Sequence, residues 1–214
     1  MDRELIVQGV GEVRAMPDLA TVRVSVDGEA PSREEAYRAA AATAATVDRV
    51  LADFEAAIDR VTTAALAVQP KTRWRKGETQ RTGWTALRVS VVEIADTSRV
   101  AELLNALAGA GASIGALSWM LAPANEFFAL ARQRAGEDAR ARAEQYASAL
   151  NIKLGPVAWA AEPGLRVSDR ANEWAAGGGV AAAFAAGGAA EEPINVNPEE
   201  VTIRAALEVG YRIA

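Results

Sequence analysis

Acidic side chains are the groups in this sequence that could perform chemistry, because the chain contains no cysteine and no histidine. Disulfides, thiolate nucleophiles, histidine-based proton transfer and the usual zinc sites are thereby excluded. Two acidic groups remain, one of Asp18, Asp27 and Glu29 near a strand end and one of Glu137 and Asp138 on a helix. Paired carboxylates catalyse proton transfer when burial separates their pKa values, and oxygen ligands suit hard cations, but no EF-hand spacing is present. We interpret both groups as solvated charges and expect no catalytic residue, no metal and no cofactor.

Two glycines, Gly9 and Gly11, raise a second chemical interpretation, a phosphate-binding loop. A dinucleotide fingerprint needs a third glycine and a helix that opens on the loop, because the helix N-terminus supplies the N–H groups that hold a pyrophosphate. Arg14 occupies the third position, a turn signal follows at residues 16–18, and residues 19–26 then alternate with period two. That alternation is typical of a half-buried strand, so we predict that the glycines mark a bulge or bend in a strand pair.

A basic and aromatic stretch, PKTRWRKGETQRTGW at residues 70–84, is the most distinctive surface that the sequence predicts. Its candidate interaction residues are Lys71, Arg73, Trp74, Arg75, Lys76, Arg81 and Trp84. Such a mixture could stack on bases, bind an acidic partner or contact another subunit; alternatively, it is a solvated arm whose tryptophans pack across the hairpin or on a neighbouring strand. The net charge of −5 argues against nucleic acid, whose affinity comes from neutralised phosphates. Unpaired backbone edges favour pairing with another chain, so we expect a homo-oligomer.

The Gly/Ala-rich segment at residues 172–195 lacks both helical and strand periodicity, which predicts a long mobile loop. It carries isolated large apolar residues, among them Trp174 and Phe184. These side chains either cover the domain's own core or become ordered on a partner subunit or ligand.

Helices and hairpin strands must position these candidates. Ser32 followed by Glu35 forms a capping box, and the apolar spacing that follows predicts a helix to about Phe54. Strands are expected at 61–69, 85–94, 113–121, 154–162 and 199–213, a short helix within 96–112, and a helix at 124–151 opened by Pro123. The last helix presents one expected inner face: Phe128, Ala131, Ala135, Ala139, Ala143, Tyr146 and Leu150.

This pattern predicts an α+β fold, with a largely antiparallel mixed sheet and about three helices packed on it. The 214 residues suit a single domain, with two lobes at 1–95 and 96–214 as an alternative division. The order strand, helix, strand, strand also occurs twice, at about 18–94 and 114–213, which is a weak signal of an internal repeat.

Three stretches together resemble the SIMPL-domain family, also called domain of unknown function 541. They are IVQGVGEVRAMPDLATVRVSV at the start, ARQRAGEDARARAEQYASALNIKLGPV in the last helix, and the terminal strand ending in VGYRI. The resemblance implies an α+β fold, a bacterial source, self-assembly, links to oxidative-stress defence or signalling-molecule partners, and frequent export to the periplasm or outer envelope. No catalytic residues are established for the family, so none are transferred. Five shared residues form a fold signature of bend, tight turn and strand entry: Gly9, Gly11, Glu12, Pro17 and Asp18.

The leading hypothesis is a non-enzymatic, self-associating protein that acts through contacts of the hairpin and the glycine-rich loop. One alternative is a small-molecule or ion-binding protein, or a weak hydrolase, that uses acidic residues near that loop. The chain starts without an apolar leader and has no apolar run of about 18 residues, so we expect a cytoplasmic protein without a transmembrane segment. The remaining alternative is an envelope protein whose leader is absent from this chain.

Overall fold

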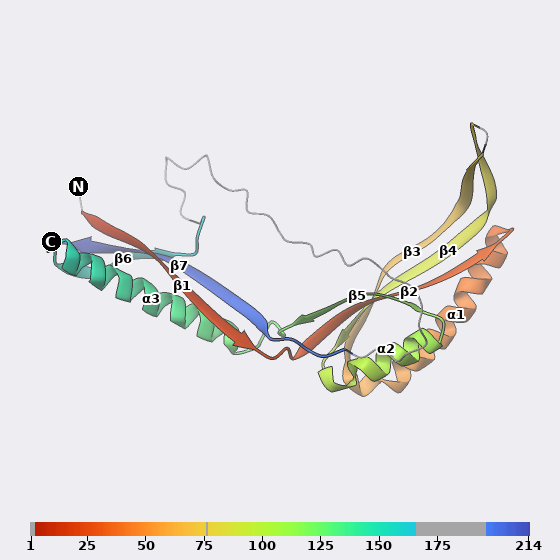
Figure 1. Ribbon diagram of the computed structural model, residues 1–214, viewed down its shortest axis with the longest axis horizontal. Coiled ribbons are helices and arrows are strands. Elements are labelled where there is room, and N and C mark those ends of the chain that lie inside the picture. The colour runs from red at the N-terminus through yellow and green to blue at the C-terminus, as the bar shows by residue number, and fades with distance from the viewer. Residues whose placement is uncertain (1–2, 76, 166–195) are drawn as a thin grey trace. The chain divides into compact units, whose positions relative to one another are not determined.

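The computed structural model describes residues 3–75, 77–165 and 196–214 and confirms the α+β class (Figure 1). The strands are β1 (Glu4–Ala15), β2 (Leu19–Ala30), β3 (Ile58–Arg75), β4 (Glu78–Ile94), β5 (Ser113–Met120), β6 (Leu154–Ala161) and β7 (Val201–Ile213). The helices are α1 (Arg33–Asp53), α2 (Val100–Gly109) and α3 (Phe127–Ala149), with short 3-10 turns η1 (Glu55–Ala57) and η2 (Thr97–Arg99). Among the residues so described, no helix combines the length and apolar character needed to cross a bilayer.

The strands form two antiparallel sheets, ordered β1-β7-β6 and β3-β4-β2-β5, and each sheet belongs to its own compact unit. The first unit contains β1, α3, β6 and β7, and the second contains β2, α1, β3, β4, α2 and β5. Residues 16–18 join β1 of the first unit to β2 of the second. The second unit is therefore inserted between β1 and α3 of the first.

Both units repeat one connectivity. In the second unit β2, α1, β3 and β4 follow one another and the sheet order is β3-β4-β2; in the first, β1, α3, β6 and β7 give the order β6-β7-β1. Each helix packs chiefly against the first and last strand of its set. The set in the first unit begins with β1. The repeat predicted at 114–213 would instead begin with β5, which pairs with β2 of the second unit.

Glycines bring each helix close to the first strand of its set. A Cβ on Gly9 of β1 would lie 2.0 Å from the carbonyl oxygen of Ala135, and a Cβ on Gly28 of β2 would lie 2.4 Å from the backbone nitrogen of Ala40. Because the β1–β7 register runs without a shift, the predicted bulge at Gly9 and Gly11 is absent, and the alternative of a bend there stays a prediction. These two glycines instead allow α3 to approach the sheet, since any side chain would meet the helix backbone.

Alanine on the facing helices completes this close packing. The buried residues of α3 recur every four positions: Ala131, Ala135, Ala139, Ala143 and Ala147. The expected inner face is correct for its alanines, but Tyr146 and Leu150 are 56% and 59% exposed because the buried row continues to Ala147. The helix also begins at Phe127 rather than directly after Pro123, and the Asn125 side chain accepts a hydrogen bond from the Phe127 N–H at 2.9 Å.

The second unit has the larger aliphatic core. Alternate residues of β2 and β4 meet α1 and α2 on one face of the sheet, so Val22, Val92 and Leu103 are fully buried. The predicted capping box is present at the start of α1, where the Glu35 N–H donates to the Ser32 hydroxyl at 3.2 Å and that hydroxyl donates to the Glu35 carboxylate at 2.9 Å. This packing supports β2 and β4 up to the point where the β3–β4 hairpin extends beyond them.

Candidate protein-interaction site

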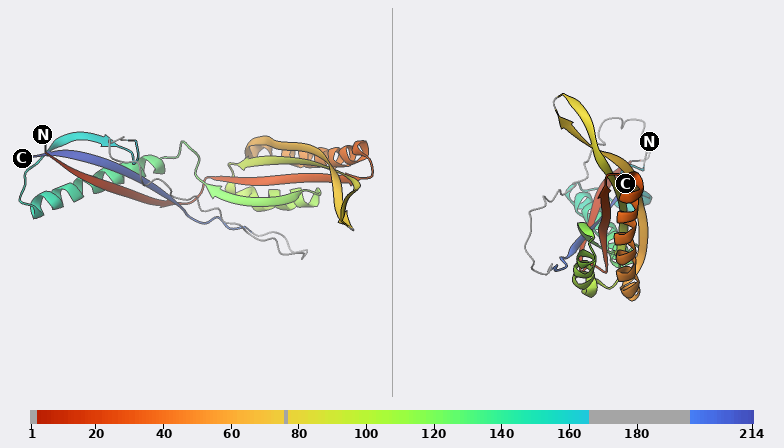
Figure 2. Two further views of the ribbon diagram at one scale, coloured as in Figure 1. Left: turned by 90° about the horizontal axis from the view of Figure 1, so that it is seen from above. Right: turned by 90° about the vertical axis from the view of Figure 1, so that its right-hand side faces the viewer.

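The β3–β4 hairpin extends beyond the sheet as a two-stranded arm (Figures 1 and 2). The last β2–β4 pair is Ala30 with Trp84; beyond it β4 pairs only with β3, from Lys71 with Gly83 to Arg75 with Glu78. We call residues 71–83 the arm. Gly77 closes it with a positive φ of 84°, a conformation that glycine adopts without steric cost.

The arm is basic and exposed, as the sequence predicts. Lys71, Arg73, Arg75 and Arg81 are all exposed, and Lys76 lies outside the described residues. Arg81 lies over the Trp84 ring at 5.6 Å, and the Lys71 ammonium forms an ion pair with Glu29. Within the described part of the chain, no ion pair engages Arg73 or Arg75. Two guanidinium groups on the arm are thus available to an acidic partner.

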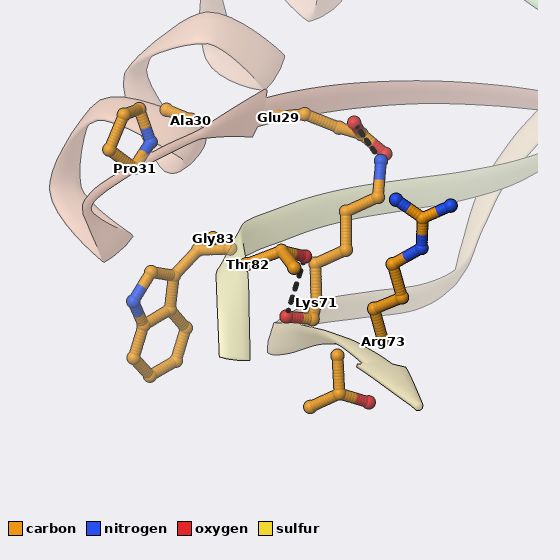
Figure 3. A pocket seen from close by; sticks show the side chains of 9 residues that line it. Glu29, Ala30, Pro31, Lys71, Arg73, Thr82 and Gly83 are labelled. Carbon is orange, nitrogen blue, oxygen red and sulfur yellow. Dashed lines mark hydrogen bonds and ion pairs between the residues drawn. The ribbon is translucent and has the colours of Figure 1, made fainter. Parts of the chain in front are cut away.

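A shallow cleft of about 600 Å³ lies where the arm leaves the sheet (Figure 3). Its lining residues are Glu29, Ala30, Pro31, Lys71, Thr72, Arg73, Thr82, Gly83 and Trp84. The Lys71 and Glu29 side chains are 50% and 49% exposed, so solvent screens their ion pair, and Arg73 extends alongside Lys71. The Thr82 hydroxyl donates to the Lys71 carbonyl at 3.2 Å and stiffens the base of the arm. The cleft can therefore receive an anionic group at Arg73.

The two tryptophans of the stretch have different surroundings. Trp84 packs against a small cluster with Ala36, Ala40 and Ala86, which agrees with the interpretation that it stabilises its own domain. Trp74 lies opposite Thr79 and is 70% exposed, so the strand register keeps the two indole rings apart. A large exposed apolar side chain flanked by two arginines is typical of a protein contact surface.

The acidic candidates are largely engaged by nearby donors. Glu29 binds Lys71, and Glu137 accepts a hydrogen bond from Gln133 at 2.8 Å. Asp138 accepts the backbone N–H of Val10 and the Arg142 Nε, each at 2.8 Å, and these bonds, the Val10 N–H first, lower the pKa of its carboxyl. Across residues 3–75, 77–165 and 196–214, no group of three or more acidic side chains could hold a metal ion.

The remaining predicted residues do not gather at the arm. Glu12 is exposed and pairs with Arg204 at 3.3 Å, while Pro17 is buried and Asp18 exposed at the junction of β1 and β2. Trp174 and Phe184, together with the rest of the loop predicted at 172–195, lie outside the described residues.

An apolar groove of about 270 Å³ between α1 and β3 was missed by the sequence analysis. Leu66 and Tyr37 border it and are 65% and 54% exposed, and alanines of α1 with Ala86 form its floor. The Arg88 guanidinium holds the Asp48 carboxylate there through bonds of 2.6 and 3.0 Å, so the two charges satisfy each other. The groove exists because α1 lies mainly over β2 and β4 and leaves most of β3 exposed. The only signal of this groove in the sequence is a run of small residues in β3 that lacks period-two alternation.

Several sheet edges are protected against pairing with another strand. The β3–β4 pairing has three register shifts and β3 contains Pro70, while the β6–β7 pairing has two and β6 contains Pro156. On β1, the Val10 N–H and the Glu12 carbonyl bond to side chains of α3. Bulges, prolines and side-chain caps are the usual protections of edge strands. Strand addition at these edges is therefore disfavoured.

Comparison with known proteins identifies the family. The chain is 27% identical over 154 residues to the uncharacterized protein YggE of Escherichia coli strain K12, and the alignment covers 72% of this chain and 63% of that protein. The same values hold for YggE of Escherichia coli O157:H7 and of Shigella flexneri, so the matched part spans less than two thirds of these relatives. A family model described as SIMPL, "Protein of unknown function (DUF541)", matches residues 5–211. Because that match extends over nearly the whole chain, the protein belongs to the SIMPL family.

Proposed function

We propose that this protein acts by binding other protein chains through the arm, and that its main partners are further copies of itself. The observation that carries the proposal is the arm itself, which extends beyond the last β2–β4 pair, Ala30 with Trp84. It exposes Trp74, whose neighbours Arg73 and Arg75 have no ion pair in the described part of the chain. A folded domain gains little from such a projection, because its residues bury almost no surface of their own. Burial of the arm residues against another chain would offset the conformational entropy that is lost when they are ordered.

Side chains rather than backbone edges carry the proposed contact. Aromatic and arginine side chains dominate the binding energy of protein interfaces, since they bury large areas and donate several hydrogen bonds. Arg73 and Arg75 lie on one face of β3 because residues two apart share a face, and Trp74 offers an aromatic anchor on the opposite face. The register shifts in β3 disfavour the alternative of a continuous intermolecular sheet.

Light scattering coupled to size-exclusion chromatography tests this proposal. In the test variant, an Asn-Gly turn replaces residues 72–82, so that the paired residues Lys71 and Gly83 flank the new turn. We expect the intact chain to form an assembly and the variant to elute as a monomer with an unchanged circular dichroism spectrum. A matched control, Tyr146→Ala, removes an exposed aromatic of the other unit and is expected to leave the mass unchanged.

Two outcomes would contradict the proposal. The intact chain could be monomeric over micromolar concentrations, or the arm variant could keep the full assembly mass. The alternative of a small-molecule or ion-binding protein depends on the loop at 172–195, outside the described residues, and stays a prediction. The cytoplasmic location and the link to oxidative-stress defence likewise stay predictions.

A further inference from the structure

The surface of a second copy that receives the arm is identified by charge, and this inference rests on the proposed function. Charges in the second unit are segregated along β3 and α1. The arm cations lie where β3 ends and α1 begins, since β2 ends at the arm base immediately before the first turn of α1. The last turn of α1, η1 and the start of β3 lie at the opposite end and carry Asp53, Glu55 and Asp59.

The carboxylates of this acidic end, defined as Asp53, Glu55 and Asp59, are available to a partner. All three residues are exposed, and no ion pair among the described residues engages them. The nearby cations already have other partners: Arg60 pairs with Glu93 at 3.0 Å and Arg99 with Glu102 at 3.1 Å.

The helix dipole increases the negative potential of the acidic end. The free carbonyl groups of a helix C-terminus carry partial negative charge, which favours cations there and disfavours carboxylates. The last turn of α1 contains no basic residue and ends at Asp53. One cation of the chain lies near this helix end, since the Arg99 guanidinium is 4.3 Å from the ring centroid of Phe54, the C-cap of α1, but it pairs with Glu102 rather than with the acidic end.

The arm of the same chain is too far from the acidic end to pair with it. Arg73 and Asp59 lie in one strand, 14 residues apart, which corresponds to roughly 45 Å at about 3.3 Å per residue. The 21 residues of α1 separate the two ends by about 30 Å along the helix. Of the acids beside the arm cations, Glu29 pairs with Lys71, and Glu78 lies opposite Arg75 without an ion pair to it. Complementary charges held this far apart can be paired only between chains.

We infer that the arm of one copy docks on the acidic end of the next copy, head to tail. Arg73 and Arg75, which share one face of β3, donate to carboxylates of the acidic end. A head-to-tail contact is heterologous: two copies joined by it keep one free arm and one free acidic end between them, so assembly continues until a ring closes or a filament forms. Because the paired groups are exposed, salt weakens the contact.

Charge reversal and recombination test the inference, with molar mass from light scattering as the readout. The first variant combines Arg73→Glu with Arg75→Glu, and the second combines Asp53→Lys with Glu55→Lys. We expect each variant alone to fall to monomer and their equimolar mixture to regain the assembly mass, since each reversed patch meets a complementary one. The control combines Glu126→Lys with Glu162→Lys, exposed residues of the other unit, and is expected to keep the intact mass.

The outcomes separate this inference from the proposed function. If replacing residues 72–82 leaves the assembly intact, the proposed function fails and the inference fails with it. If that replacement gives monomers but the acidic-end variant keeps the full mass, the arm is an interface and the head-to-tail contact is wrong. A mixture of the two reversed variants that stays monomeric also overturns the inference, provided that both retain the circular dichroism spectrum of the intact chain.

Discussion

The carboxylate of Asp138 on α3 accepts a hydrogen bond of 2.8 Å from the backbone N–H of Val10 in β1. One turn earlier, Arg134 donates to the Glu12 carbonyl at 2.7 Å. Two backbone groups on the outer edge of β1 are thus satisfied by side chains of the helix that packs on this strand. This arrangement both fastens α3 to the sheet and prevents another strand from pairing with β1 there.

Replacing Asp138 with Asn should reduce the acid sensitivity of folding. The Val10 N–H, followed by Arg142, lowers the pKa of the folded-state carboxyl. The stability that this group contributes is fully present above the unfolded pKa of about 3.9 and is lost as pH falls through the lower folded pKa. Urea unfolding from pH 6 to pH 2.5 should show a smaller loss below about pH 4 in the Asp138→Asn variant. Parallel curves for the two proteins would refute this assignment.

Gly9→Ala should destabilise the first unit strongly. The new Cβ would meet the Ala135 carbonyl oxygen at 2.0 Å and the Ala139 nitrogen at 2.4 Å, both backbone atoms that cannot rotate away. Overpacking of this kind should lower the free energy of unfolding by about 3 kcal/mol. Chemical unfolding measures this change. The matched control is Gly136→Ala on α3, the helix that packs against Gly9. A Cβ there meets nothing within 4 Å, so this substitution should stabilise the protein by about 0.5–1 kcal/mol. Equal effects of the two substitutions would contradict the close-packing argument.

Gly210 and Trp159 should be energetically coupled. A Cβ on Gly210 would lie 2.2 Å from the Trp159 Nε1, and this indole N–H donates to Glu4 at 3.0 Å. Gly210→Ala should displace the ring and cost about 1–3 kcal/mol. In a Trp159→Ala background the same substitution should cost at least about 1 kcal/mol less, as a double-mutant cycle on unfolding free energies would show. Additive effects would mean that the ring does not oppose the added methyl group.

Ser32→Ala should destabilise the second unit by about 1 kcal/mol, because the Ser32 hydroxyl accepts the orphan N–H of Glu35 at the start of α1. Thermal unfolding followed by circular dichroism measures this change. Thr46→Ala in the middle of the same helix is the control, since alanine has the higher helix propensity and should leave stability equal or slightly raised. A loss at Thr46 as large as that at Ser32 would argue against a capping effect.

Local elements were predictable from the sequence because their signals lie within a few residues. The Ser32 cap precedes its helix directly, and the period-two alternation of residues 201–213 correctly predicted β7. The hairpin of β3 and β4 could be predicted since its two strands are adjacent in the chain. The basic character of the arm is likewise a property of composition.

Tertiary structure alone decided which distant segments meet. Alternation shows which face of a strand is buried but not which strand lies beside it, so the pairing of β1 with β7 and the separation into two sheets were not predictable. The roles of Gly9 and Gly28 depend on a helix that approaches from elsewhere in the chain. The uncovered β3 groove and the separation of the arm from Asp53 depend on where α1 lies on the sheet. Such non-local packing arises from burial of whole faces, which no short stretch of sequence specifies.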